Sequence, residues 1–292
     1  MEKETLRVVG LLQSGRYRKV AKVAEALYKR KPACFAKPIV SGLLEFEWEA
    51  YLTEKKHELQ GIFDDTALTR SVVVFSNEEV IGGADAFLQW AQNTHDVKDS
   101  MPFPLYAAMA KDAYKERFLG NDVDFVYMTI SIDGSDVGKL IFELCKRLCP
   151  KTCENFKALC VGHATESGQT LHYKDSLIHR IVAGGWIQGG DILGGSGAHS
   201  ESIYGPNFPD ESFSMSNDSR GIIGMANKGI HTNGSQFYIT LKPSKWMDKS
   251  FVAFGKIVEG SDVLKKIEEL PARNERPITS VRISDCGVYK AT

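Results

Sequence analysis

Residues 179–191 read HRIVAGGWIQGGD, and the predicted fold of the C-terminal half of the chain starts from this stretch. Its first residues belong to a strand candidate at 176–182, and a run of glycines follows. Glycine has no Cβ and adopts backbone dihedrals that other residues avoid, so these glycines indicate sharply turned loops. The stretch therefore predicts a strand followed by tight turns, within a β-rich domain.

The β pattern extends to both sides of this stretch. From Val126 to Ile132, apolar and polar residues alternate, which is typical of a half-buried strand. Asp133-Gly134 indicates a turn, and residues 139–144 provide the returning strand. Further strands are expected at 221–225, 236–240, 252–258 and 281–289, and helices at 151–160 and 261–270. The pattern predicts a mainly β barrel closed at its ends by helices.

Several separated motifs accompany residues 179–191 in a fixed order. They are 154–156 (ENF), 173–176 (YKDS), 204–213 (YGPNFPDESF), 225–227 (MAN), 232–237 (TNGSQF), 246–248 (WMD), 254–256 (FGK) and 285–287 (DCG). Together they span a domain at 122–292 that resembles the cyclophilins. The resemblance implies a closed eight-stranded barrel capped by two helices, with peptidyl-prolyl cis-trans isomerase chemistry in a surface groove.

This chemistry requires no cofactor. Rotation about an X-Pro bond faces a barrier of ~18–20 kcal/mol, because the twisted amide loses its resonance. An enzyme can seat the proline ring in an apolar slot and meet the proline nitrogen with a fixed donor. Such contacts accelerate the rotation only where they bind the twisted state better than the planar one.

The resemblance places the catalytic donor at Arg180 and its orienting partner at Gln188. A guanidinium suits the donor role because it stays charged and holds a rigid fork. The peptide-binding residues that the resemblance implies are Trp186, Ala226, Asn227, Gln236, Tyr238, Trp246 and Met247. The implied ligands are proline-containing segments of other proteins and, with weakened affinity, a cyclosporin-like compound.

The apolar slot departs from the family pattern. Gly185 stands where the resemblance implies the phenylalanine that floors the slot, and Phe251 stands in place of a histidine. A lost phenyl ring removes ~150–250 Å² of contact, which at ~25 cal/mol/Å² is several kcal/mol of binding. Trp186, at a methionine position, either refills the slot or blocks it.

Two functions follow for this domain. We expect a cyclophilin-like protein that binds proline-containing segments with weak or no isomerase activity. The alternative is an active isomerase with a remodelled pocket, in which Trp186 supplies the missing ring.

Residues 1–95 predict a separate α/β domain. A strand at 6–12, helices near 17–28 and 43–59, a hairpin at 71–81 and a helix at 86–91 follow one another. This order resembles a glutaredoxin-like member of the thioredoxin fold. Redox chemistry in that fold needs a thiol at the start of the first helix, where Ser14-Gly15 stands here. We expect an interaction module, with glutathione-linked chemistry through Gly82-Gly83-Ala84-Asp85 as the less supported alternative.

Residues 96–121 are expected to link the two domains through a helix at 105–118, with the boundary near Gly120 and Asn121.

Composition limits the partners and the compartment. The 292 residues carry a net charge of -1 with a pI near 6.7, which gives no footprint for nucleic acid or an anionic membrane. The sequence shows no signal-peptide pattern and no apolar run near the ~20 residues that span a bilayer. A cytoplasmic or other intracellular location, without secretion, is expected.

Six cysteines are expected to be free thiols. Cys149, Cys153 and Cys160 fit the start and one face of a helix opened by Pro150, where cysteine behaves as a small buried apolar residue. Their spacing lacks the paired pattern of zinc sites, so we favour core positions over a metal site and expect no metal.

Overall fold

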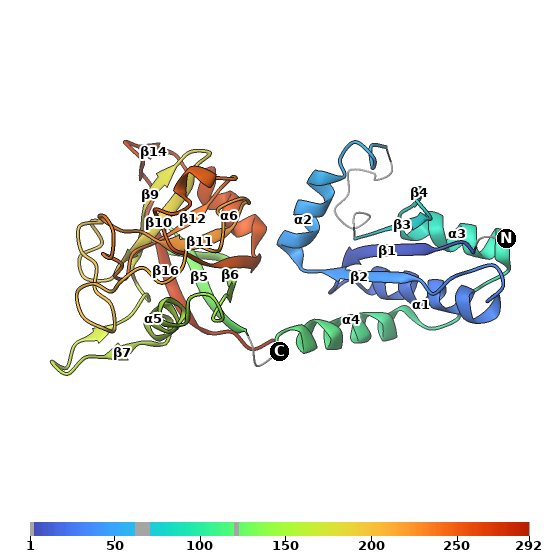
Figure 1. The fold of residues 1–292 in the computed structure, drawn as a ribbon, viewed down its shortest axis with the longest axis horizontal. Helices are drawn as coiled ribbons and strands as arrows, with labels where there is room; N and C mark the ends of the chain where they lie inside the picture. Colours follow the sequence, from blue (N-terminus) through green and yellow to red (C-terminus); the bar gives the residue numbers. More distant parts are fainter. Residues whose placement is uncertain (1–2, 62–70, 120–122, 292) are drawn as a thin grey trace. The chain divides into compact units, whose positions relative to one another are not determined.

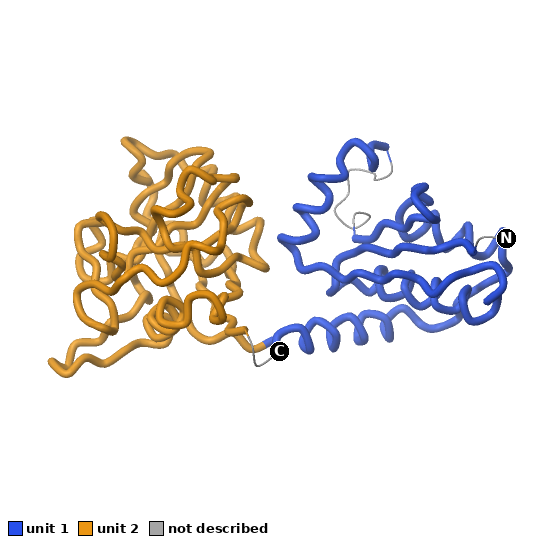
Figure 2. Tube along the Cα trace, viewed as in Figure 1, with its two compact units in different colours: residues 1–119, 291–292 blue, residues 120–290 orange. Residues whose placement is uncertain are grey.

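The structure is a computed structural model that describes residues 3–61, 71–119 and 123–291. The chain divides into two compact units, residues 1–119 with 291–292 and residues 120–290 (Figure 2). The boundary predicted near Gly120 and Asn121 lies outside the described residues.

The first unit alternates strands and helices (Figure 1). Its elements are β1 (Leu6–Leu11), α1 (Gly15–Arg30), β2 (Ile39–Leu43), α2 (Glu45–Glu54), β3 (Val72–Ser76), β4 (Glu79–Gly82), α3 (Ala84–His95) and α4 (Phe103–Arg117). The sheet order is β2-β1-β3-β4, with β1 parallel to β2 and antiparallel to β3. This topology agrees with the predicted thioredoxin-like α/β fold.

Successive side chains of β3 point to opposite faces of this sheet, and each face packs against its own hydrophobic core. Val72 and Val74 pack with the apolar residues of α1 and α3. Val73 and Phe75 face the other way and pack with Trp48 of α2. The all-apolar run of β3 is therefore explained by burial on both faces.

Helix α4 belongs to the first unit, which differs from the linker expected at 96–121. Tyr106 and Ala110 are fully buried, and Tyr106 donates a hydrogen bond of 2.7 Å to Asp99. Lys19 of α1 forms an ion pair with the same aspartate at 3.7 Å. The buried face of α4 gives it a packing partner in α1, so it is a structural element of this unit.

The second unit is a closed barrel of eight strands in the order β10-β12-β11-β13-β6-β5-β16-β9. The strands are β5 (Asp124–Ile132), β6 (Ser135–Leu144), β9 (Leu177–Val182), β10 (Trp186–Asp191), β11 (Ile222–Met225), β12 (Phe237–Thr240), β13 (Ala253–Glu259) and β16 (Val281–Val288). Its other elements are α5 (Pro150–Val161), α6 (Ser261–Glu268), a 3-10 turn η1 (Lys245–Met247), and the short hairpins β7 (His163–Ala164) with β8 (Thr170–Leu171) and β14 (Ala272–Arg273) with β15 (Arg276–Pro277). The predicted eight-stranded barrel with two helices is confirmed.

Helix α5 contributes aromatic and thiol side chains to the barrel core. Phe156 is fully buried, and its ring centroid lies 5.6 Å from that of Phe237 and 5.1 Å from that of Phe254. Cys153 and Cys160 are buried on the same helix, which confirms their predicted core positions. Burial raises the pKa of Cys149, at the start of the helix, to about 12, so this thiol stays protonated.

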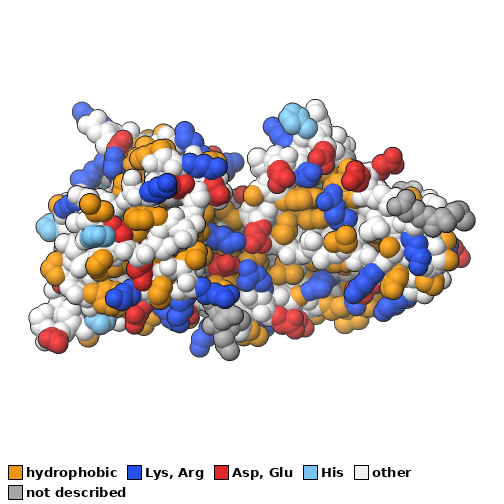
Figure 3. All heavy atoms as spheres, in the orientation of Figure 1, with side chains coloured by type: hydrophobic (Ala, Val, Ile, Leu, Met, Phe, Trp, Pro, Cys, Tyr) orange, Lys and Arg blue, Asp and Glu red, His pale blue; other side chains and the backbone are white. Residues whose placement is uncertain are grey.

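The surface carries charges of both signs. On the face drawn in Figure 3, basic and acidic side chains are interspersed. Across the described ranges, no helix is long and apolar enough to cross a membrane.

Candidate functional site

Strand register brings the predicted site residues into one row across the barrel. Arg180 of β9 pairs with Gln188 of β10, Gln188 pairs with Tyr238 of β12, and Tyr238 pairs with Gly224 of β11. Residues paired across antiparallel strands point to the same face of the sheet. The row therefore places a charged, a polar and an aromatic side chain next to one another.

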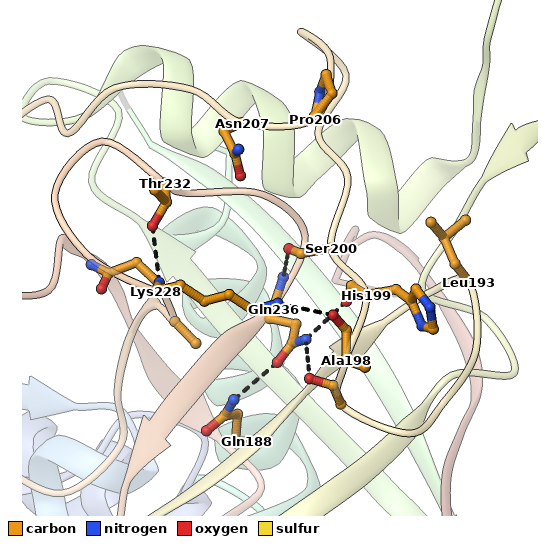
Figure 4. Close-up of a pocket in the computed structure, with 13 residues that line it drawn as sticks. Gln188, Leu193, Ala198, His199, Ser200, Pro206, Asn207, Lys228, Thr232 and Gln236 are labelled. Carbon is orange, nitrogen blue, oxygen red and sulfur yellow. Dashed lines mark hydrogen bonds between the residues drawn. The ribbon is translucent and has the colours of Figure 1, made fainter.

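The polar part of the row is a chain of hydrogen bonds. Arg180 Nη1 donates to Gln188 Oε1 at 3.4 Å, and Gln188 Nε2 donates to Gln236 Oε1 at 2.9 Å. Gln236 Nε2 in turn donates to the carbonyls of Gly197 and His199, at 2.9 and 2.8 Å. In Figure 4, Gln236 lies between Gln188 and the loop that carries His199. These bonds fix the orientation of both glutamine amides.

The loop whose carbonyls accept hydrogen bonds from Gln236 is held by the carboxylate of Asp191, at the end of β10. The backbone N–H groups of Gly194 and Gly197 donate to its carboxylate at 2.9 and 2.7 Å. Burial raises the pKa of Asp191, but these and further backbone hydrogen bonds outweigh it and hold the pKa well below its usual value. Gly197 has φ +89°, and an added Cβ would lie 2.7 Å from the His179 ring, so only glycine fits this turn.

A cavity of about 420 Å³ opens beside these amides (Figure 4). Its lining includes four of the predicted residues, which are Gln188, Ala226, Asn227 and Gln236. Lys228 extends across it and donates from Nζ to the Ala198 carbonyl at 3.0 Å. The cavity thus combines the amide side chains of Gln188, Asn227 and Gln236, which can anchor the backbone of an extended peptide, with apolar side chains. The apolar lining residues are Leu193, Ala198, Pro206 and Ala226.

The apolar part of the row is covered. Tyr238 and Met247, which were expected to be peptide-binding residues, are only 1% and 2% exposed. The Tyr238 ring packs edge-on against Phe251, with centroids 5.9 Å apart, and it lies so close to Gly224 that an added Cβ there would overlap it. Its hydroxyl donates to Asn217 Oδ1 at 2.8 Å. Tyr238 and Met247 therefore offer little surface to a ligand ring.

Gly185 and Trp186 lie at the outer wall of the slot. Gly185 lies in the turn between β9 and β10, where an added Cβ would be 3.1 Å from Val182 Cγ1. Trp186 packs against Trp246, with ring centroids 5.7 Å apart. The Arg180 guanidinium lies over the Trp186 ring at 5.2 Å, a cation–π distance. Trp186 therefore forms the wall beneath the arginine, and Trp246, 64% exposed, forms the rim.

Arg180 itself has a partner that the sequence motifs did not indicate. Its Nε donates to Glu275 Oε2 at 2.7 Å. Arg180 lines a second, open hollow together with Glu275, Arg273 and Arg276, and it is not among the residues that line the first cavity. The two residues are 95 positions apart, so no local sequence pattern predicts their ion pair. The one signal in the sequence is that Glu275 stands between arginines in residues 273–276, which read RNER.

The position of a redox thiol in the first unit is covered as well. An added Cβ at Gly15 would lie 3.1 Å from the backbone nitrogen of Ala107 and 3.2 Å from the Phe103 ring, both in α4. Asp85, at the Gly82-Gly83-Ala84-Asp85 turn, forms an ion pair with Arg16 at 2.9 Å. These contacts occupy the end of α1 where thioredoxin-like chemistry would take place.

The titratable side chains of the described residues do not gather into a metal site. Within residues 3–61, 71–119 and 123–291, no group of three or more His, Cys, Asp or Glu residues is placed to hold a metal ion. The thiols of Cys149 and Cys153 lie against backbone carbonyls at 3.8 and 3.6 Å.

Comparison with known proteins agrees with this geometry. The profile of the family described as "Cyclophilin type peptidyl-prolyl cis-trans isomerase/CLD" matches residues 127–288. The Mus musculus protein named "Probable inactive peptidyl-prolyl cis-trans isomerase-like 6" is 48% identical over 286 residues, which is 97% of this chain and 90% of that protein. The Homo sapiens protein of the same name is 47% identical over 285 residues, 97% of this chain and 91% of that protein. "Peptidyl-prolyl cis-trans isomerase cyp11" of Rhizopus delemar is 44% identical over 166 residues, 56% of this chain and 49% of that protein. The chain therefore belongs to the cyclophilin family.

Proposed function

We propose that the barrel binds proline-containing segments of other proteins and has weak or no prolyl isomerase activity. The observation that carries this proposal is the contrast between the two halves of the groove. The amides of Gln188 and Gln236 border an open cavity, whereas Tyr238 and Met247 are covered. Backbone anchoring is thus supported, whereas Tyr238 and Met247 expose almost no apolar surface that a proline ring could contact.

Catalysis needs the ring held against a fixed donor. The family's donor is present as Arg180, but it is paired with Glu275, and Tyr238 and Met247 expose almost no surface to a proline ring. Each ~1.4 kcal/mol of lost transition-state binding costs a factor of ten in rate, so the loss of a ring-sized contact removes several factors of ten. The relatives named as probable inactive isomerases, which share nearly the whole chain, support the same proposal.

Two further parts of the proposal follow from the same features. A cyclosporin-like ligand would bind weakly, because the apolar floor at Tyr238 and Met247 is covered. An intracellular location is supported by the six cysteines, all of which are free thiols in the structure.

The test is prolyl cis-trans exchange measured by NMR on an Ala-Pro and a Gly-Pro peptide, with the full chain. We expect peptide resonances to shift on binding, with exchange rates near the uncatalysed 10–100 s time scale. The matched variant is Gly185→Phe with Phe251→His, which restores both implied family residues and should gain activity.

Two results would count against the proposal. Rapid exchange with the natural chain that disappears in Arg180→Ala would make the protein an active isomerase, with Trp186 as the wall of a working slot. Unshifted peptide resonances at millimolar concentration would remove the binding function.

A further inference from the structure

Glu275 lies at the tip of the β14–β15 hairpin, in a backbone conformation that glutamate rarely adopts. Asn274 has φ +50° and Glu275 has φ +64°, both left-handed. Two-residue hairpin turns of this kind strongly favour Asn-Gly, because glycine takes the second position without steric cost. The first residue here follows that preference and the second does not.

The hairpin is attached to the barrel beside the groove. The Ile181 N–H donates to the Glu275 carbonyl at 2.6 Å, and Arg276 Nη2 donates to the Ser196 carbonyl at 3.0 Å. These bonds hold the turn next to β9 and to the loop that closes the first cavity. The Glu275 side chain is therefore directed at Arg180 by two fixed attachments.

The carboxylate occupies a hollow that is otherwise basic. Arg180, Arg273 and Arg276 line it, and Glu275 is the acidic residue among its lining residues. The Arg180–Glu275 ion pair is partly exposed, with side chains 41% and 46% accessible. Without Glu275, three guanidinium groups would face the hollow unopposed, which is an arrangement suited to a carboxylate of a bound segment.

The ion pair also determines where the Arg180 guanidinium lies. Nε is taken by Glu275, Nη1 by Gln188, and the guanidinium plane is supported by Trp186. Glu275 thus holds the family's donor at the hollow, and Arg180 is not among the residues that line the first cavity. A segment that needs this guanidinium has to compete with an internal carboxylate.

We propose that Glu275 is a specificity-determining residue: it acts as an internal counter-ion to the arginines that line the hollow and disfavours segments with an acidic residue beside the proline. This inference rests on the proposed binding function. It predicts that the natural groove prefers neutral over acidic proline segments, and that removal of Glu275 reverses this preference.

The experiment compares two peptides, acetyl-Ala-Gly-Ala-Pro-Ala-Ala-amide and the same peptide with aspartate in place of the alanine before the proline. Binding of each to the full chain is measured by NMR titration for the natural sequence, Glu275→Gly and Glu275→Gln. The glycine variant keeps the left-handed turn, and the glutamine variant keeps the side-chain size. Glu166→Gln, in the exposed β7–β8 loop, changes the net charge equally and is the matched control.

We expect Glu275→Gly to bind the acidic peptide at least about fivefold more tightly and the neutral peptide less than about twofold more tightly, in line with partly exposed ion pairs. This gain should disappear in 1 M salt, where the screening length is about 3 Å. The Arg180 Nε–H resonance should shift in both Glu275 variants and stay unchanged in Glu166→Gln.

Equal gains for both peptides, no gain at all, or an unmoved Arg180 Nε–H resonance would overturn the inference. If the natural chain binds the neutral peptide and the variants do not differ from it, the inference fails while the proposed function stands. If only the Glu275 variants bind the acidic peptide, the inference stands while the proposed function of the natural chain fails. If no protein binds either peptide, both fail.

Discussion

Replacing Tyr238 by phenylalanine removes a single hydroxyl group, and we expect it to destabilise the barrel. The hydroxyl donates to Asn217 Oδ1 at 2.8 Å, and Tyr238 and Asn217 are 1% and 0% exposed. The aromatic ring is unchanged by the substitution, so no apolar contact is lost. What remains is a buried amide oxygen without its donor.

The size of the effect follows from that unsatisfied oxygen. A buried acceptor left without a partner costs about 1–3 kcal/mol. The Asn217 amide cannot turn away easily, because its Nδ2 and its backbone N–H both donate to Asp248 Oδ1, at 3.0 and 2.8 Å. We therefore expect a loss of about 2 kcal/mol in the free energy of unfolding, or roughly 4–8 °C in melting temperature for a domain of this size.

The four tryptophans allow a measurement with an internal control. Urea unfolding is followed through the indole N–H signals, of which Trp186 and Trp246 report the barrel and Trp48 and Trp90 report the first unit. A double-mutant cycle with Asn217→Ala isolates the pairwise energy. The reasoning is refuted if the barrel signals move by less than about 0.5 kcal/mol, or if the first-unit signals move equally.

Three further predictions concern the groove loop and the first unit. Asp191→Asn should cost about 3 kcal/mol at pH 7, because several charge-assisted hydrogen bonds become neutral ones. The pKa of Asp191 in the folded chain lies below its unfolded value of about 3.9. The ionised carboxylate therefore stabilises the fold fully above about pH 3.9, and this stabilisation is lost as the pH falls through the folded pKa. In urea titrations between pH 4 and 2, the free energy of unfolding of Asp191→Asn should therefore fall less than that of the natural chain. Gln236→Ala should weaken binding of a proline peptide about tenfold while the melting temperature changes by only a few degrees, because its amide orders both Gln188 and the 197–199 loop; unchanged affinity would contradict this. Gly15→Cys should give a thiol that reacts slowly with a disulfide reagent, because α4 covers the position, and rapid reaction would show that it is open.

Most strands and both helices of the barrel could be predicted because their sequence signals are local. Alternation from Val126 to Ile132, the turn at Asp133-Gly134 and the helix after Pro150 each depend on nearby residues. Most strand ends agreed with the structure to within one or two residues, but β6 begins at Ser135, four residues before the predicted start at 139. The expectation of tight turns over the glycine run was wrong for Trp186–Asp191, which form β10 between β9 and β12. The family motifs singled out Arg180, Gln188 and Gln236 as site residues, and the hydrogen bonds join the three side chains in the structure.

Other features depend on contacts between distant parts of the chain. The balanced charges of residues 105–118 suggested a connecting helix, but Tyr106 and Ala110 are buried, so α4 packs on α1. Whether Trp186 would refill or block the slot was open, because a side chain's direction depends on its neighbours. Contacts with Trp246 and Arg180 place it in the outer wall, while Tyr238 and Phe251 cover the floor.

The sequence by itself determined which residues could form a peptide groove and which positions departed from the family. Only the tertiary structure decided what those departures do, because the pairing of Arg180 with Glu275 and the burial of Tyr238 join residues that no local pattern connects. Local spacing specifies strands, turns and helix ends, whereas the charge and accessibility of a groove are set by side chains that meet only after the barrel has closed.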